Sequence, residues 1–427
     1  MSDSTLRHAV GLTPTIKPLD LRLRQPPQGF ARAFLTPPAS VASPPPPPAT
    51  SLAFFFHPAI DAGAEPAAQD HAASARSSAG MKRRRFAVGN AEQYEEIRRL
   101  GEGAFGSVVK ARHRTTGKFV AIKRLAGSSQ AGGTEALLRE ARFLEDASGS
   151  GAGAANPFVV GFHGIVRVPG TFVDLRLVME HVGPNLHDLL RRQNPIGETS
   201  PPLPEATVRA AMYQLLTGAK KMHARRIIHR DIKPSKILVA PDCSVLKICD
   251  FGLAMSTDDD PPPYEPAGTL GYMAPEMLLD KPDYDERVDA WSLGCVMAEL
   301  INGWNPFQGL SEEGQLCAIF DVLGAPDDTT WPWFSSTAFA TVVMPELDMQ
   351  RSNLLREQFP ETKLSEQGFE VLSGLLTCDP EKRLTAAAAL ELPWFSNKTD
   401  VLLELPKTEE IALPLPKRLR VRFVCAT

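Results

Sequence analysis

Two residues of opposite charge, Asp231 and Lys233, stand close together in the stretch HRDIKPSKIL, which runs from His229 to Leu238. A carboxylate at Asp231 can accept a hydrogen bond from an attacking hydroxyl group. The ammonium group of Lys233 can neutralise a phosphoryl group while it is transferred. Side chains of these two types suit a site where a hydroxyl group attacks a phosphoryl group.

A further carboxylate, Asp250, follows an apolar run in KICDFGLA and precedes Phe251 and Gly252. Carboxylates are common ligands of a magnesium ion that bridges phosphate oxygens. We therefore expect Asp250 to be the metal ligand of this site.

A glycine-rich stretch, LGEGAFGSVV, has the spacing GxGxxG, which on its own is a weak signal. In the Rossmann fingerprint the same spacing opens a helix. Here SVVKA continues as a strand, which indicates a hairpin. The motif alone leaves two alternatives open: a purely structural hairpin, or one that folds over nucleotide phosphates. The residues of this stretch are Leu100, Gly101, Glu102, Gly103, Ala104, Phe105, Gly106, Ser107 and Val108.

Lys123 lies in the apolar run VAIK, where burial of an ammonium group without an anionic partner is costly. Nucleotide phosphates and a carboxylate would supply that partner, and Glu140 in TEALLREARFL is the carboxylate we expect. Glu135 competes for this pairing, although its place at the helix start also suits a helix cap. An exposed lysine on an edge strand is the remaining alternative.

The elements that carry these residues follow from the periodicity of the chain. Three short alternating runs from Tyr94, namely YEEIRRLGEG, GSVVKARHR and FVAIKRL, predict β-strands joined by turns. Apolar residues at helical spacing predict a helix over 134–147. Strands resume in FVVGFHGIVRV and FVDLRLVMEHV, and helical periodicity dominates after about residue 186. The expected fold class is α+β, with a small strand-rich lobe before a larger helical lobe.

Other motifs are architectural. MAPEML contains Glu276, DAWSLGCVMAEL contains Asp289, and DPEKRL offers Arg383 as a buried partner for Glu276.

In this order and spacing, the motifs resemble those of eukaryotic protein kinases over residues 94–395. The resemblance implies a bilobal protein-kinase fold, ATP and Mg²⁺ as cofactors, and a protein substrate that accepts the γ-phosphoryl group. AIFDVLGAPDDTTWP and GLLTCDPEKRLTAAAALELPWF resemble the cyclin-dependent kinase (CMGC) group of serine/threonine kinases. Within that group, the F-type branch that activates other such kinases is the expected match. Other cyclin-dependent kinases or the C-terminal domain of RNA polymerase II are the expected substrates.

The resemblance also implies roles that spacing alone does not assign. The glycine-rich stretch from Leu100 to Val108 and Lys123 are expected to bind ATP. Met179 corresponds to the gatekeeper, and Glu180 and Val182 offer backbone groups to adenine. Thr269 is expected to hold Asp231 and Lys233 in place.

Two departures concern regulation. TEALLRE keeps Arg139 and Glu140 of the group's P-S-T-A-I-R-E helix but not the rest, which weakens the case for a cyclin partner. Ala104 and Phe105 replace the Thr and Tyr whose phosphorylation blocks ATP use in cell-cycle kinases, so this brake is absent.

The activation segment, residues 250–276, departs as well. Tyr264 stands where the group carries a phosphorylated Thr, and Met273 replaces an Arg that accompanies a preference for proline after the acceptor. The carboxylates of 258–260 can partly replace a phosphate near Arg230, with a solvated acidic loop as the alternative. We expect activity that does not depend on a phosphothreonine in this segment.

The most consequential departure is Lys236, which replaces the Asn that holds a second magnesium ion in the kinase pattern. Lysine offers no acceptor atom, and an ammonium group ~4 Å from a divalent cation is repelled by roughly several kcal/mol. The second metal should bind poorly, unless the ammonium group itself takes that cation's place against the triphosphate. A catalytically competent kinase is the expected reading, and a nucleotide-binding pseudokinase scaffold is the alternative.

The remaining expectations concern the whole chain. Its 427 residues carry a net charge of −4, which argues against a nucleic-acid partner. No apolar run reaches the ~18 residues of a spanning helix, so no membrane partner is expected. The six cysteines are dispersed, which argues against disulfides and zinc. Residues 1–93 are expected to form a disordered Pro/Ala/Ser-rich tail, 94–395 the kinase domain and 396–427 an extension. KRRR and PKRLRVR are weak address signals for the nucleus, so nucleus and/or cytoplasm is the expected location.

Overall fold

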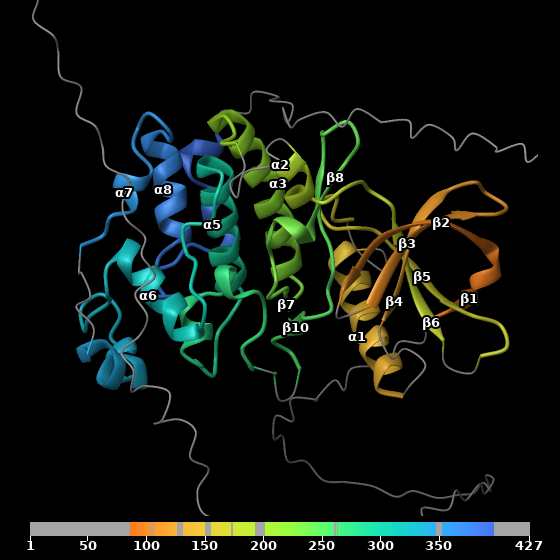
Figure 1. Cartoon of the computed structure of the whole chain (residues 1–427), viewed down its shortest axis with the longest axis horizontal. Helices are drawn as coiled ribbons and strands as arrows, with labels where there is room; N and C mark the ends of the chain where they lie inside the picture. The colour runs from red at the N-terminus through yellow and green to blue at the C-terminus, as the bar shows by residue number, and fades with distance from the viewer. Residues whose placement is uncertain are drawn as a thin grey trace, which may run out of the picture. The chain divides into compact units, whose positions relative to one another are not determined.

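The computed structural model describes residues 86–103, 106–125, 131–149, 155–171, 174–192, 201–259, 262, 264–346 and 352–396. The N-terminal lobe contains a six-stranded sheet in the order β1-β5-β6-β4-β3-β2, seen at the right of Figure 1. Its strands are β1 (Val88–Asn90), β2 (Tyr94–Gly103), β3 (Gly106–His113), β4 (Phe119–Leu125), β5 (Phe162–Arg167) and β6 (Leu175–Glu180).

The three strands expected after Tyr94 are confirmed as β2, β3 and β4, which pair antiparallel in chain order. β1 was not expected, because three residues with exposed side chains carry no periodic signal. This strand pairs with β5 in parallel, and the ring of Phe86 lies 5.8 Å from that of Phe162. Backbone pairing and one aromatic contact therefore extend the sheet to the N-terminal side of Tyr94.

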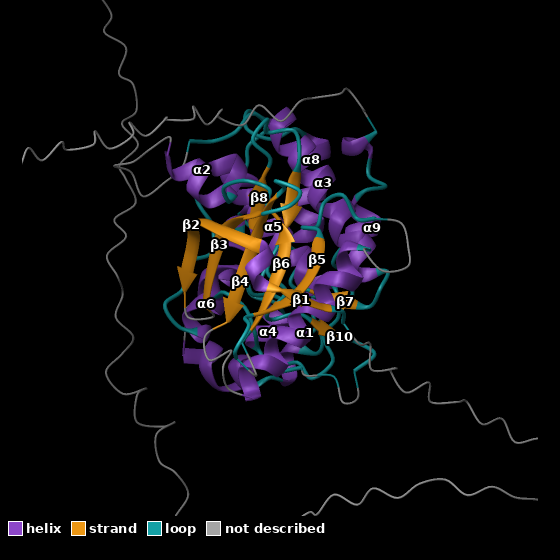
Figure 2. Cartoon of the chain, turned by 90° about the vertical axis from the view of Figure 1, so that its right-hand side faces the viewer, coloured by secondary structure: helices purple, strands orange, loops and turns teal. Residues whose placement is uncertain are grey.

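Helix α1 (Ala131–Ser148) contains the expected helix and contacts β5 and β6. Leu137, Ala141 and Leu144 are almost fully buried, whereas the expected apolar position Ala136 is exposed. Figure 2 shows α1 behind the sheet strands that it supports. The buried stripe of α1 also fixes which helix position points toward β4.

The C-terminal lobe is mainly helical, so the expected bilobal α+β fold is confirmed. Its α-helices are α2 (Leu186–Arg192), α3 (Glu205–His223), α4 (Pro275–Leu278), α5 (Arg287–Asn302), α6 (Glu312–Leu323), α7 (Leu355–Gln358), α8 (Glu366–Leu375) and α9 (Ala386–Ala389). Short 3-10 and π turns are η3 (Pro234–Lys236), η4 (Leu270–Tyr272), η5 (Phe334–Ser336), η6 (Phe339–Val343), η7 (Met344–Glu346) and η8 (Pro393–Phe395), with η2 (Ala91–Gln93) in the first lobe. Two small antiparallel pairs complete the lobe: β7 (Ile227–Ile228) with β10 (Met255–Ser256), and β8 (Ile237–Val239) with β9 (Leu246–Ile248).

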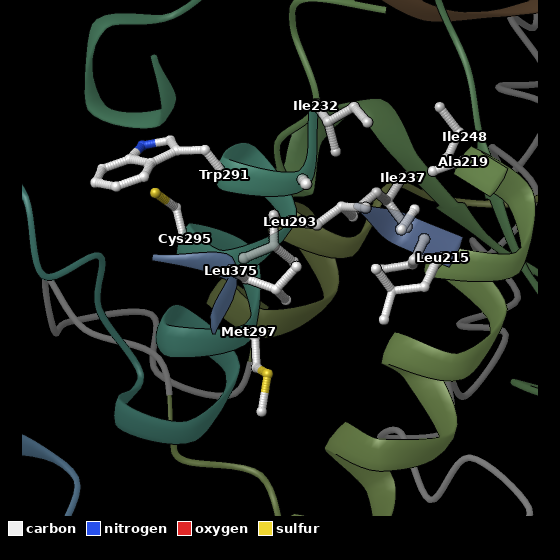
Figure 3. Close-up of a cluster of buried hydrophobic side chains, with 14 of the residues drawn as sticks. Leu215, Ala219, Ile232, Ile237, Ile248, Trp291, Leu293, Cys295, Met297 and Leu375 are labelled. Carbon is white, nitrogen blue, oxygen red and sulfur yellow. The ribbon is translucent and has the colours of Figure 1, made fainter. Parts of the chain in front are cut away.

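Apolar residues interleaved with the charged motifs hold them to the helical core. Ile232, Ile237 and Ile248 are fully buried, and Figure 3 shows them in one cluster with Leu215 and Ala219 of α3. Leu293 of α5 lies in the same cluster. Because these isoleucines alternate with the polar residues of HRDIKPSKIL and KICDFG, their burial turns the polar residues away from the core.

Residues 1–85 and 397–427, including the basic stretches KRRR and PKRLRVR, lie outside the described residues. Within the described ranges, no helix combines the length and apolar character that crossing a membrane requires.

Candidate active site

The loop that carries Asp231 and Lys233 is anchored by Asp289 at the start of α5. The two carboxylate oxygens of Asp289 accept hydrogen bonds from the backbone N–H groups of His229 at 2.8 Å and Arg230 at 2.9 Å. Arg230 has a φ of 68°, and Asp250 has a φ of 71°. Left-handed conformations of this kind cost of order 1–3 kcal/mol each and persist only where the surroundings over-determine them. The buried hydrogen bonds to Asp289 provide that restraint at Arg230.

The expected trio of Asp231, Lys233 and Thr269 is brought together. The Thr269 hydroxyl donates to Asp231 Oδ1 at 2.7 Å and accepts from Lys233 Nζ. Lys233 Nζ also lies 3.1 Å from Asp231 Oδ1. Thr269 is 36 residues from Lys233 in the chain, so only the tertiary fold closes this network.

Lys123 joins the sheet lobe to the helical lobe. Its Nζ donates to Glu140 Oε1 at 2.7 Å and to Asp250 Oδ1 at 2.6 Å. Lys123 and Glu140 are buried, whereas Glu135 is exposed, which decides the pairing in favour of Glu140. The alternative of an exposed lysine on an edge strand is wrong, because β4 lies between β3 and β6.

Lys236 takes part in the same cluster, which the sequence analysis did not foresee. Its ammonium group donates to Asp250 Oδ2, so the two oxygens of Asp250 each face a lysine. The backbone explains this contact: the Cys249 N–H donates to Lys236 O at 2.9 Å, and Ile237 pairs with Ile248. The side chain at 236 therefore lies next to the residue that follows Cys249.

The charges shift the pKa values of the cluster in opposite directions. Burial alone would raise the pKa of Asp250, but the ammonium groups of Lys123 and Lys236 outweigh it and hold that pKa well below its usual range. Burial alone would lower the pKa of Lys123, but Glu140 and Asp250 outweigh it and raise that pKa. The pKa of Lys236 shifts in the same direction as that of Lys123. Burial alone would lower it, but Asp250 outweighs burial and raises it, with a smaller contribution from Asp231. The three groups are therefore charged at neutral pH.

His229 links the catalytic loop to the segment that carries Asp250. Its Nε2 donates to the Cys249 carbonyl at 3.1 Å, and its Nδ1 accepts from the Asp231 N–H at 3.2 Å. The ring also makes an edge contact with Phe251, with the centroids 5.0 Å apart. These contacts fix the spacing between Asp231 and Asp250.

Arg230 contacts neutral groups of the activation segment and the loop before α5. It donates to Leu253 O at 2.8 Å, Glu265 O at 3.3 Å and the Tyr284 hydroxyl at 2.8 Å. Tyr264, at the position of the group's phosphorylated Thr, packs edge-on against Tyr284 with ring centroids 5.2 Å apart. Sequence reasoning missed Tyr284, because nothing near it in the chain marks it as a partner of Arg230.

The acidic stretch 258–260 lies against α1 through one of its residues. Asp259 Oδ1 is 3.7 Å from Arg142 Nη2, whereas Asp260 lies outside the described residues. Arg139 donates to the Ala254 carbonyl at 3.1 Å. The activation segment therefore contacts α1 at two points close to Glu140.

The glycine-rich stretch forms the end of the β2–β3 hairpin, with Gly101 opposite Val108 and Gly103 opposite Gly106. Val108 is in turn the register partner of Lys123 on β4, so the hairpin lies next to the lysine. Three other expected residues are exposed or half-buried on the same two strands: Leu100, Glu102 and Ser107. Ala104 and Phe105 lie outside the described residues.

Glu180 and Val182 lie at the connection from β6 to the helical lobe. The Glu180 carboxylate accepts from the Gly161 N–H at 2.9 Å and from Lys247 Nζ at 2.9 Å. Gly183 follows so close to β8 that an added Cβ would lie 2.0 Å from the Val239 carbonyl oxygen. Only glycine permits this close approach, which fixes the path of the connection.

The expected buried pair of Glu276 and Arg383 is confirmed, with two hydrogen bonds of 2.6 and 2.7 Å. The pair ties the end of the activation segment to the loop before α9.

Comparison with known proteins decides the family. A family model described as the protein kinase domain matches residues 94–395. The chain belongs to the protein kinase family. The kinase is 44% identical over 311 residues to a protein from Oryza sativa subsp. japonica named as cyclin-dependent kinase F-2, covering 72% of this chain and 90% of that relative.

Two Arabidopsis thaliana proteins extend the comparison. Cyclin-dependent kinase B2-1 is 34% identical, with 73% of this chain and 96% of the relative covered. Cyclin-dependent kinase G1 is 35% identical, with 78% of this chain covered, and the chain spans 53% of that relative's length. The protein is thus a serine/threonine kinase of the cyclin-dependent kinase type, and the pseudokinase alternative finds no support in these relatives.

Proposed function

We propose that this kinase transfers the γ-phosphoryl group of ATP to serine or threonine hydroxyls with the residues gathered around Asp231 and Asp250. The observation that carries the proposal is the closed network of Thr269, Asp231 and Lys233. It supplies an acceptor for the hydroxyl proton and a cation for the moving phosphoryl group, held by one shared hydroxyl.

Each residue has a distinct part in this proposal. Asp231 orients the acceptor hydroxyl and takes its proton, and Lys233 stabilises the charge of the transferred group. Thr269 is a positioning residue, because it acts through Asp231 and Lys233. Lys123, held by Glu140, binds nucleotide phosphates beside the glycine hairpin. Backbone groups of Glu180 and Val182 bind adenine.

The donor set of the site fits one magnesium ion better than two. Asp250 supplies a carboxylate, and magnesium in such sites needs only one or two carboxylates besides phosphate oxygens. Within the described residues, no group of three or more His, Cys, Asp or Glu side chains is arranged to hold a metal ion. When bound, the ion neutralises charge on the phosphate oxygens. Asp250 would hold it after exchanging one of its two ammonium partners.

We further propose that the kinase acts without a cyclin and without a phosphothreonine in its activation segment. The Glu140–Lys123 pair forms in the single chain, and Arg139 and Arg142 connect α1 to Ala254 and Asp259. Hydrogen bonds to Glu265 and Tyr284 engage Arg230 without a phosphate. These contacts support an active arrangement of α1 and the activation segment in the chain by itself.

Other cyclin-dependent kinases are our first candidate substrates and the C-terminal domain of RNA polymerase II is the second, on the basis of the sequence resemblance to the cyclin-dependent kinase group. We place the kinase in the nucleus and/or cytoplasm on the basis of KRRR and PKRLRVR.

The test is phosphate transfer from γ-labelled ATP to a panel of cyclin-dependent kinases and a heptad-repeat peptide, by the purified full chain alone. Asp231→Asn and the parent are compared after both have passed a thermal-melting check for folding. We expect transfer by the parent and its loss in Asp231→Asn. Equal labelling by both proteins would assign the signal to a contaminant and refute the proposal.

A further inference from the structure

We propose that Lys236 binds the triphosphate directly, in place of a second divalent cation, so that nucleotide binding depends little on divalent ions. The inference rests on the proposed ATP site and adds one residue and one cation preference to it.

The backbone of Lys236 is held on both sides, and its ammonium group is held by Asp250. Its backbone N–H donates to Lys233 O at 2.8 Å, and its carbonyl accepts from Cys249 N at 2.9 Å. The side chain is 20% exposed and reaches Asp250 Oδ2. An ammonium group held in this way needs little further ordering to meet a ligand at the same place.

A lysine at position 236 excludes the second magnesium ion that the kinase pattern places there. Magnesium takes oxygen ligands in a near-octahedral arrangement. Lysine provides three donors and no acceptor, so Lys236 cannot be a ligand. The carboxylate oxygen that contacts this position, Asp250 Oδ2, already faces the Lys236 ammonium group. A second magnesium ion would have to displace the Lys236 ammonium group from Asp250 and then remain beside that ammonium group.

An ammonium group is also a good partner for phosphate oxygens, as a compact charge with three donors. Asp250 Oδ1 is already engaged by Lys123, so Asp250 stays paired when Lys236 turns one of its donors toward a phosphate. Three lysines face three carboxylates in this site, and asparagine at 236 would leave one excess negative charge. The groups counted are Lys123, Lys233, Lys236, Asp231, Asp250 and Glu140. The parent site is thus better suited to the metal-free nucleotide, which is the more negative form.

The first experiment measures the dissociation constant of the non-hydrolysable ATP analogue AMP-PNP by calorimetry, in excess Mg²⁺ and in EDTA. The parent should bind in both media, with constants within about threefold, whereas Lys236→Asn should bind at least about tenfold more weakly in EDTA, the loss expected for one charged hydrogen bond. Lys236→Arg retains the charge and should behave like the parent. Lys220→Asn, on the exposed face of α3, is the matched control for a lost lysine.

The second experiment counts bound Mn²⁺ by electron paramagnetic resonance at saturating AMP-PNP. We expect one ion per parent chain and a second ion in Lys236→Asn, whose amide oxygen restores an acceptor. Melting temperatures without nucleotide confirm that each variant is folded.

The outcomes separate the two proposals. Two Mn²⁺ ions in the parent, or parent binding that requires Mg²⁺ as strictly as that of Lys236→Asn, would overturn the role of Lys236 and leave the ATP site standing. Absence of AMP-PNP binding by the parent in both media would overturn the ATP site itself.

Discussion

Replacement of Thr269 by valine tests the network at the centre of the site. Valine has nearly the shape of threonine but lacks the hydroxyl group that donates to Asp231 and accepts from Lys233. The substitution therefore removes two hydrogen bonds and little packing volume. In the parent, Lys233 Nζ lies 3.1 Å from Asp231 Oδ1, so a direct contact between these two side chains can survive in the variant.

The magnitude follows from the charge on both partners. A hydrogen bond to a charged group contributes about 1.5–3 kcal/mol. Because the surviving contact between Asp231 and Lys233 retains part of the alignment, we take the lower half of this range. A barrier higher by about 1.5–2 kcal/mol lowers kcat by roughly 10- to 30-fold.

The assay is the initial rate of phosphate transfer at varied ATP concentration. Thr269→Val should lower kcat by this factor and leave KM for ATP within about twofold, since no nucleotide-binding residue changes. Thr269→Ser keeps the hydroxyl group and should recover most of kcat. A merely structural role would instead lower the melting temperature of Thr269→Val together with its activity.

The reasoning is refuted if Thr269→Val, folded and stable, retains kcat within about threefold of the parent, because one charged hydrogen bond is worth more than that. Equal losses in the serine and valine variants would also contradict it, since only valine removes the hydroxyl group.

Three further predictions concern stability and activation. Arg383→Met should lower the free energy of unfolding in urea by about 3–5 kcal/mol, because it leaves the buried Glu276 carboxylate unpaired; an effect below about 1 kcal/mol would contradict this. The lowered pKa of Asp250 means that its stabilising charge is complete above the ordinary carboxyl pKa of about 3.9 and is lost as the pH falls through the lowered value. The stability gap between the parent and Asp250→Asn should therefore be constant from about pH 5 to 8 and shrink below about pH 4, as measured by urea unfolding at each pH. Phosphatase treatment should leave the rate of phosphate transfer unchanged, and loss of activity through removal of a threonine phosphate would exclude activation without a phosphothreonine. Asp259→Asn should lower the rate about two- to fivefold, as expected for one partly exposed ion pair with Arg142.

Much of the fold was readable because its signals are local. Alternation in the runs after Tyr94 is imposed by the two faces of a strand, and β2, β3 and β4 appear at those positions. β1 escaped notice, since its three residues are held by backbone pairing with β5 rather than by buried side chains. Backbone hydrogen bonds of this kind leave no pattern in side-chain type.

By itself, the sequence determined the family, the fold class and the chemical types at the site, because short motifs place a carboxylate or an ammonium group at a defined step in the chain. Which charged groups share a contact was decided by the tertiary structure. Glu140 rather than Glu135 reaches Lys123, because the buried stripe of α1 faces the sheet.

Lys236 is the clearest case of this division. Its residue type marks it as a departure from the kinase pattern, but its role in the site depends on its contact with Asp250. The backbone hydrogen bond between Lys236 and Cys249 places its ammonium group against the second carboxylate oxygen of Asp250. Ion pairs act through space over a few ångströms, and chain order does not record which segments approach that closely. The pairing of β8 with β9 brings the segments of Lys236 and Asp250 together. The residue that replaces a metal ligand therefore places a cation beside Asp250.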